Sequence, residues 1–257
     1  MFTLSIYFFI FALVMRYKIT LSYNGAGFCG WQVQPDAPSV QGCIQNALAT
    51  LLHAEIKLTG AGRTDTGVNA SHYVAHFDSD TPVECAETRY KLNAILPSGI
   101  AIKSIEPAGD DFHARFSATG REYTYFLHRY KDPFAEKFSW LYQFPDVDFE
   151  AMNLAARHLL GTHDFRCFEK TGADNKTSIC TVTEAGWFKE DEDHWYFRIA
   201  ADRFLRNMVR AIVGTLLEVG RGRRSPESIA ELIENGTRCD AGQSVPGHAL
   251  FLSKVKY

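Results

Sequence analysis

The chain has 257 residues, of which 46% are hydrophobic and 22% are charged, the composition of a folded soluble protein with one large or two modest domains. Its formal net charge of -3 excludes a basic field over the whole molecule, so a polyanionic partner would have to meet a local basic patch. The six cysteines form no C-x-x-C pair and no close cysteine and histidine cluster, so they support neither a zinc site nor a disulfide framework and favour a reducing compartment.

The chain opens with an apolar run, MFTLSIYFFIFALVM. This run has no basic residue before it and no clear small-x-small cleavage site after it, and it is too short to cross a bilayer comfortably. We expect residues 1–14 to be an upstream extension of a reading frame that starts at Met15, with no membrane association. A signal peptide or a membrane anchor is the alternative interpretation.

The first half of the chain alternates between strand-like and helical patterns. Residues 17–25, YKITLSYNG, alternate as a half-buried strand does and end in the Asn24-Gly25 turn signal. After a proline-containing loop, Ser39 is a plausible N-cap, and apolar residues then recur at helical spacing from Val40 to Leu52.

Further elements follow around a glycine-rich bend. The ranges with strand character are 55–62, 71–79, 100–108 and 121–130, and a short helix is expected over 85–96. His72 and His76 lie four residues apart, but in a strand-like run that lacks the internal glutamate of a helical zinc-protease motif. We therefore expect no metal site there.

The second half repeats the alternation. Helices are expected over 148–161, 204–220 and 225–235, and strands over 179–189, 194–203 and 248–257. This order favours two α+β halves with antiparallel or mixed sheets over a parallel array of strands and crossover helices. The N-terminal half is expected to span 15–113 and the C-terminal half 114–257.

The bend GAGRTDTG (60–67) has two interpretations. It lacks the spacing of either common phosphate-binding loop, and a strand rather than a helix follows it. It is either a tight connection, in which Asp65 pairs locally with Arg63 or forms an Asx turn, or a site that a substrate approaches closely. In the second case Asp65, held as an anion by a neighbouring arginine, acts as a nucleophile without a cofactor.

The strand over 121–130 carries an aromatic pattern. Tyr123 and Tyr125 share one face, where they either pack in the core or present a ring on which an unstacked base rests. Arg121, just before them, suits a phosphate group.

The helix expected over 204–220 and the residues beside it carry a basic pattern. Arg203, Arg206 and Arg210 fall along one helical stripe, and the sequence RGRR follows at 221–224. This stripe is either a solvated face or the local basic patch that a polyanionic partner requires.

Four segments carry a specific resemblance. GAGRTDTGVNA, FHARFSATGREYTY, FLRNMVRAIVGTLLEVG and HALFLSKVKY, in this order, resemble the tRNA pseudouridine synthase A family, and the resemblance covers residues 17–257. Several ordered motifs across a chain are more specific than any one of them. The resemblance implies the pseudouridine synthase fold, in which two α+β halves share one extended central sheet crossed by a basic cleft.

The family's functional residues map onto particular positions. Its catalytic aspartate falls on Asp65, the arginine of the same motif on Arg63, and its active-site tyrosine on Tyr123. The arginine that ends F-L-x-x-M-V-R falls on Arg210, which we expect to pair with the carboxylate. The chain departs from the family pattern at Asn69, where histidine is common, at Cys167, where serine is frequent, and in the loop VPGHALFL.

The resemblance also implies a function. The chain is expected to convert uridine to pseudouridine at positions 38, 39 and 40 of the tRNA anticodon stem-loop, in the cytoplasm, as a homodimer and without a cofactor. The N1–C1′ bond breaks and the uracil is rejoined through C5, so there is no net redox change. The residues expected to contact the RNA are Tyr123, Arg63, Arg121, Arg203 and Arg206.

Two rival functions remain open. In the first, the chain is an RNA-binding module in which Asp65 is merely structural. In the second, it is a hydrolase that cleaves a glycosidic bond and releases free uracil, which usually requires a second acidic residue. No such partner lies near Asp65 in the sequence.

Overall fold

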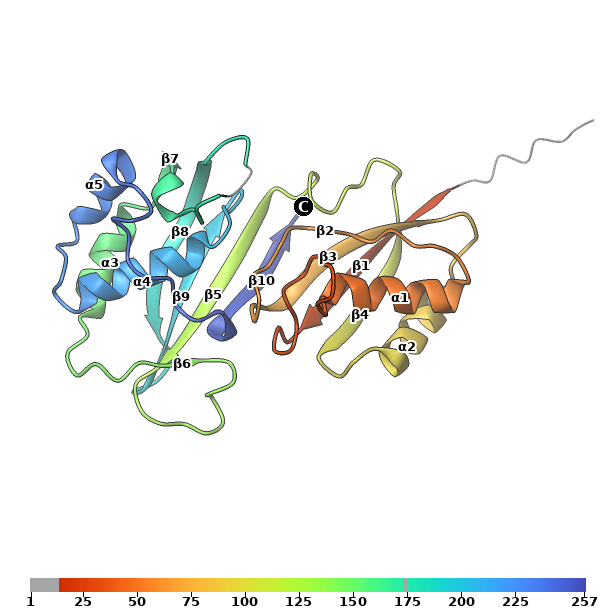
Figure 1. Ribbon diagram of the computed structural model, residues 1–257, viewed down its shortest axis with the longest axis horizontal. Coiled ribbons are helices and arrows are strands. Elements are labelled where there is room, and N and C mark those ends of the chain that lie inside the picture. Colours follow the sequence, from red (N-terminus) through yellow and green to blue (C-terminus); the bar gives the residue numbers. More distant parts are fainter. Residues whose placement is uncertain (1–13, 173–174) are drawn as a thin grey trace, which may run out of the picture.

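The computed structural model describes residues 14–172 and 175–257. The prediction that residues 1–14 are an upstream extension therefore falls, apart from residue 14, on residues outside the described part of the chain. Within these two ranges, ten strands join in one sheet, with five α-helices packed on it (Figure 1). The expected α+β class, with one extended central sheet, is confirmed. Within the described ranges, every helix is too short or too polar to cross a membrane.

The bounds of the elements are as follows. The strands are β1 (Met15–Tyr23), β2 (Thr59–Gly60), β3 (Asn69–Ser79), β4 (Ile100–Ala108), β5 (Gly120–His128), β6 (Trp140–Leu141), β7 (Gly161–Asp164), β8 (Ile179–Lys189), β9 (His194–Ala201) and β10 (Leu250–Lys256). The helices are α1 (Val40–Leu52), α2 (Cys85–Ile95), α3 (Phe149–Arg157), α4 (Met208–Gly220) and α5 (Ser228–Asn235), with 3-10 turns η1 (Arg166–Phe168) and η2 (Gly247–Ala249).

The last strand of the chain lies at the centre of the sheet. The strand order is β4-β1-β3-β10-β5-β9-β8-β7, with β2 added beside β3 and β6 beside β5. β10 runs parallel to β3, with Phe251 opposite Asn69, and antiparallel to β5, with Leu252 opposite Tyr123. The C-terminal strand therefore joins the part of the sheet that carries β3 to the part that carries β5 (Figure 1).

The hydrophobic core lies on one face of this sheet. On β10, Leu250 belongs to a buried cluster under α3, α4 and α5, and Leu252 belongs to a second cluster under α1 and α2. Because residues two apart on a strand point the same way, both groups of helices cover the same face. The side chain of Tyr123 packs against both clusters, which places it between the two groups of helices.

Helix α1 begins as the sequence predicts. The hydroxyl of Ser39 accepts a hydrogen bond from the Gly42 N–H at 3.2 Å, which satisfies one of the first-turn donors. Val40, Ile44 and Leu48 are buried along one side of the helix. The N-cap and the periodicity were therefore sufficient to predict this element.

Helix α4 begins at Met208, so the prediction of a helix from residue 204 was wrong. Asn207 has a φ of 66°, a left-handed conformation that cannot continue a right-handed helix. The Arg206 carbonyl instead accepts a hydrogen bond from the Lys170 N–H at 3.0 Å. Arg203 and Arg206 therefore precede the helix, and the predicted stripe of three arginines along one helix does not form.

The strand expected over 55–62 is reduced to β2, Thr59–Gly60. Its two residues pair with His76 and Ala75 of β3. Beyond them the Gly62 N–H donates to the Tyr73 hydroxyl at 3.3 Å, and that hydroxyl donates to the Gly62 carbonyl. At Gly62 the Tyr73 side chain, and not the backbone of a neighbouring strand, satisfies the backbone groups, so the chain leaves the sheet here.

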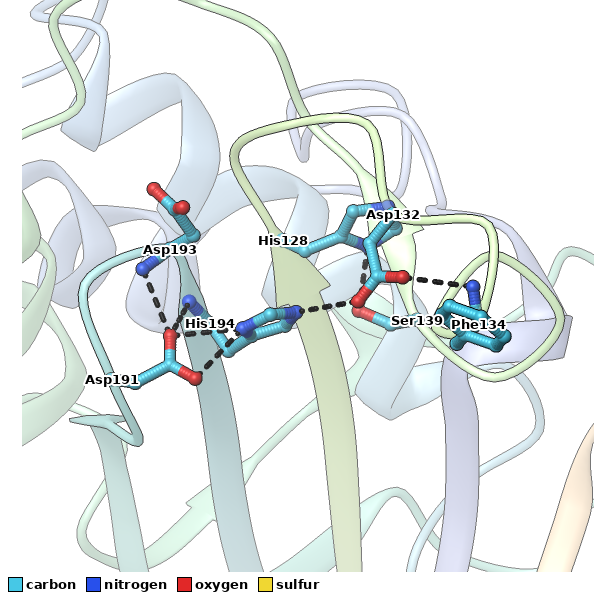
Figure 2. A network of polar contacts seen from close by, with 7 residues as sticks. All are labelled: His128, Asp132, Phe134, Ser139, Asp191, Asp193 and His194. Atoms are coloured by element: carbon cyan, nitrogen blue, oxygen red, sulfur yellow. Dashed lines mark hydrogen bonds and ion pairs between the residues drawn. The ribbon is translucent and has the colours of Figure 1, made fainter.

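A loop between β5 and β6 is fastened to the turn between β8 and β9 (Figure 2). His194 Nδ1 lies 2.9 Å from Asp191 Oδ1, and its Nε2 lies 3.4 Å from Asp132 Oδ2. His128 Nδ1 and the Ser139 hydroxyl share a hydrogen bond of 2.9 Å. The two carboxylates raise the pKa of His194, with the hydrogen bond to Asp191 as the main cause.

Protonation of His76 is expected to destabilise the fold at acid pH. The His76 side chain is buried, and its Nδ1 accepts a hydrogen bond from the Ala114 N–H at 3.1 Å. Burial, and to a lesser extent the charges of Arg16 and His113, lower the pKa of His76 to about 4 from 6.5. Below pH 6.5 the unfolded chain therefore binds the proton more tightly, so stability falls as the pH drops from about 6.5 towards 4.

Urea unfolding measures this effect. Between pH 7 and pH 4 the wild type should lose about 3 kcal/mol of unfolding free energy more than His76→Asn, which keeps an acceptor for the Ala114 N–H but does not titrate. An equal loss in both proteins would show that His76 does not drive the acid sensitivity.

Candidate active site

Asp65 lies in the bend between β2 and β3, which two close backbone contacts hold. A β-carbon on Gly30, whose φ is +86°, would lie 2.3 Å from the Thr64 carbonyl oxygen. A β-carbon on Gly25 would lie 2.3 Å from the Val68 carbonyl oxygen. Only glycine permits either contact, so the loop after β1 packs directly on the backbone at both sides of Asp65.

Hydrogen bonds fix the bend further. The Trp31 N–H donates to the Thr64 carbonyl at 3.3 Å, and the hydroxyls of Tyr23 and Thr64 share a hydrogen bond of 2.8 Å. The Val68 N–H donates to the Asp65 carbonyl at 3.1 Å, which closes the turn after the carboxylate. The Asp65 backbone is therefore held in place.

The carboxylate faces two arginines. Arg210 Nη1 lies 3.3 Å from Asp65 Oδ2, and their side chains are 22% and 25% exposed. Arg206 Nε lies 4.0 Å from Asp65 Oδ1, and the Arg206 side chain is more exposed, at 54%. Both oxygens of Asp65 thus have a cation nearby.

Arg210 is itself anchored by its surroundings. Its Nε donates to the Val245 carbonyl at 2.7 Å, and the Val245 N–H donates to the Arg210 carbonyl at 3.2 Å. Arg210 lies in the first turn of α4, so the helix and the 244–247 loop together aim its guanidinium at Asp65. The local salt bridge between Asp65 and Arg63, one alternative from the sequence, is not among the ion pairs of the described residues.

Tyr123 lies beside this pair on β5. Burial raises the pKa of its hydroxyl, and the negative charge of Asp65 raises it further. Its ring meets the ring of Phe204 edge to face, with centroids 5.1 Å apart. Tyr125, the other tyrosine on this face, is fully buried in the core, so it offers no stacking surface.

The guanidinium of Arg121 is engaged with the backbone. It donates to four carbonyls, those of Ala118, Asp202, Ala61 and Arg115, at 3.1, 2.9, 3.1 and 2.8 Å. These bonds join the Asp65 bend to the segment before β5 and to the end of β9. They favour a positioning role for Arg121 over the phosphate contact suggested by its sequence position.

The remaining arginines differ in their surroundings. Arg63 is exposed, two residues before Asp65 on the same bend, and its side chain makes no hydrogen bond or ion pair with the residues that the structure describes. Arg203 is partly exposed, and its Nη1 donates to the Thr177 carbonyl at 3.1 Å.

Asn69 and Val245 support the site, and the sequence did not reveal their roles. The Asn69 side chain is buried, accepts from the Gly25 N–H at 2.8 Å and donates to the His248 carbonyl at 2.6 Å. It therefore links the loop after β1, the start of β3 and η2. The resemblance marked Asn69 and the VPGHALFL loop only as departures from the family pattern. Their roles depend on hydrogen bonds to the backbone of distant segments, which a sequence motif does not show.

Comparison with known proteins agrees with this geometry. A profile for the family described as tRNA pseudouridine synthase matches residues 155–257. The tRNA pseudouridine synthase A of Bacteroides fragilis is 48% identical over 245 residues, which cover 95% of this chain and 97% of that protein. The protein of the same name from Parabacteroides distasonis is 50% identical and covers 94% and 96%. The chain belongs to the tRNA pseudouridine synthase A family.

The relationship extends to more distant bacteria. The tRNA pseudouridine synthase A of Bacillus subtilis is 42% identical over 246 residues, which cover 95% of this chain and 99% of that protein. The sequence-based expectation of an enzyme of the tRNA pseudouridine synthase A family is therefore confirmed. Within such an enzyme, the carboxylate of Asp65 lies between two cations and next to a phenol, and it is held there by backbone contacts.

Proposed function

We propose that this enzyme converts uridine to pseudouridine at positions 38, 39 and 40 of the tRNA anticodon stem-loop, with Asp65 as the catalytic carboxylate. The observation that carries the proposal is the ion pair of 3.3 Å between Asp65 and Arg210, which forms at the position of the family's catalytic aspartate. The family relationship supports the substrate class, and the fixed bend supports a preorganised nucleophile.

Each side chain of the site has a role in the proposed reaction. Asp65 initiates cleavage of the N1–C1′ bond, and Arg210 pairs with its carboxylate and orients it. Tyr123 contacts the uracil while the base turns and is rejoined through C5. Arg63, exposed on the same bend, fills the space that the target nucleotide leaves when it flips out of the stack.

The test is a pseudouridine map of three unmodified tRNAs, each with a single uridine at position 38, 39 or 40. We expect the wild-type enzyme to convert the uridine in all three. Release of free uracil would instead indicate a hydrolase, and tight binding with no modification would indicate an RNA-binding module.

Arg203 and Arg206 are proposed to contact the tRNA backbone. The Arg206 side chain is 54% exposed and lies 4.0 Å from the Asp65 carboxylate, and Arg203 lies in the same segment between β9 and α4. The double variant Arg203→Ala, Arg206→Ala should weaken tRNA binding, and the slope of log affinity against log salt should fall by about 0.7 to 0.9 for each lost phosphate contact. Arg157→Ala, an exposed arginine on α3, is the control. An unchanged salt slope in the double variant would mean that this segment is only solvated surface.

We also propose that the enzyme is a cytoplasmic homodimer. The face of the sheet opposite the helices supports the dimer, because it carries an apolar cavity of about 460 Å³. Phe126, Phe138 and Phe251 are among the residues that line it. Sedimentation should show twice the chain mass of 28.9 kDa, and a monomer at working concentration would contradict the dimer.

A further inference from the structure

Phe116 is a highly exposed aromatic residue in the segment between β4 and β5. Its side chain is 76% exposed. A single exposed phenylalanine is ordinary on a protein surface. Phe116 differs from such a residue because the turn that carries it is held by many contacts.

The turn over residues 113–117 is closed by two reciprocal hydrogen bonds. The His113 N–H donates to the Ser117 hydroxyl at 2.9 Å, and the Ser117 N–H donates to the His113 carbonyl at 2.9 Å. Inside the turn, His113 Nδ1 accepts from the N–H groups of Arg115 and Phe116 at 3.2 and 3.3 Å. The backbone of Phe116 is therefore fixed although its side chain is exposed.

The ring of Phe116 is positioned as well. The His113 ring packs beside it, with centroids 4.4 Å apart, and the Arg115 guanidinium carbon lies 5.6 Å from its centroid. His113 in turn contacts the buried ring of His76, with centroids 4.8 Å apart. An exposed aromatic ring beside an exposed cation on a rigid turn is complementary to a nucleotide. The ring can stack on the π-face of the base, and the cation can pair with the phosphate.

Arg121 connects this turn to the proposed active site. Its Nη2 donates both to the Arg115 carbonyl at 2.8 Å and to the Ala61 carbonyl at 3.1 Å. Ala61 lies four residues before Asp65, and Arg121 lies two residues before Tyr123. One nitrogen atom thus holds the 113–117 turn against the bend that carries the proposed nucleophile.

We propose that Phe116 is a stacking platform for an unpaired base of the substrate tRNA within a few nucleotides of the target uridine, with Arg115 beside the adjacent phosphate. This inference rests on the proposed function. Stacking does not select among bases, because every base has a π-face. A platform of this kind would hold the anticodon loop whatever its base sequence. An enzyme whose one active site modifies three neighbouring positions needs this tolerance.

The test compares Phe116→Ala, Phe116→Leu and Phe116→Tyr with the wild type. The dissociation constant for tRNA and the KM should rise about fivefold or more in the alanine and leucine variants, while kcat changes by less than about twofold. The tyrosine variant should restore both values, because it restores a ring. A tRNA with 2-aminopurine at successive anticodon-loop positions should show fluorescence quenching at one position with the wild type, and this quenching should be lost in the alanine and leucine variants.

Tyr90→Ala is the matched control, because Tyr90 is 75% exposed on α2. It should bind and modify tRNA as the wild type does. Wild-type affinity and KM in Phe116→Ala, or full affinity in Phe116→Leu, would overturn the stacking role. A wild-type enzyme that leaves tRNA unmodified would overturn the proposed function itself, which separates the two failures.

Discussion

Replacing Asp65 by asparagine is expected to abolish pseudouridine formation and to leave tRNA binding close to that of the wild type. Asparagine has the same shape as aspartate and can still accept a hydrogen bond from Arg210, but it carries no negative charge and is a very poor nucleophile. The rate should fall by roughly four orders of magnitude or more, the scale seen when an enzyme loses its nucleophile. Release of tritium from C5-labelled uridine in tRNA measures this rate.

Two controls make the Asp65→Asn result interpretable. The bend should keep its structure, since the Val68 N–H bonds the carbonyl of residue 65 and not its side chain. Equal thermal unfolding and equal tRNA affinity would therefore assign the lost rate to the carboxylate. If the variant instead turned over like the wild type, Asp65 would be a structural residue.

Replacing Arg210 by alanine is expected to have the second largest effect. The variant loses both the cation that lies 3.3 Å from Asp65 and the donor to the Val245 carbonyl. Removal of one preorganised electrostatic partner typically lowers kcat about a hundredfold to a thousandfold. Arg206, at 4.0 Å from the other carboxylate oxygen, is too exposed to replace the lost partner fully.

Arg210→Lys separates the two contributions of Arg210. Lysine keeps the positive charge but cannot both reach the carboxylate and donate to Val245 as the guanidinium does. Its kcat should lie between the values for alanine and wild type, with a KM near that of wild type. Full activity in Arg210→Ala would mean that the ion pair plays no part in the reaction.

The elements with strong local patterns could be predicted from the sequence. Helix α1 has both an N-cap and a regular apolar spacing, and β1 alternates between buried and partly exposed residues. The start of α4 could not be predicted in this way, because the apolar spacing continues back through Phe204 and Leu205. The left-handed backbone of Asn207 and the bond from Lys170 to Arg206 decide where the helix begins.

The candidate site shows the same limit. Asp65 and Tyr123 could be singled out from their own motifs, but Asp65 and Arg210 are 145 residues apart, so no local pattern indicates their contact. Family resemblance placed Arg210, and the strand order with β10 between β3 and β5 explains how the two segments meet. The four carbonyls around Arg121 and the two partners of Asn69 belong to several segments, so neither environment follows from neighbouring residues.

The most direct test of Asp65 as the catalytic carboxylate is a single-turnover map of pseudouridine at positions 38 to 40. One unmodified tRNA preparation is incubated with excess wild-type enzyme or with excess Asp65→Asn. Complete conversion by the wild type, and none by a variant that binds the same tRNA equally well, is the result predicted here. Conversion by both enzymes, or by neither, would contradict it.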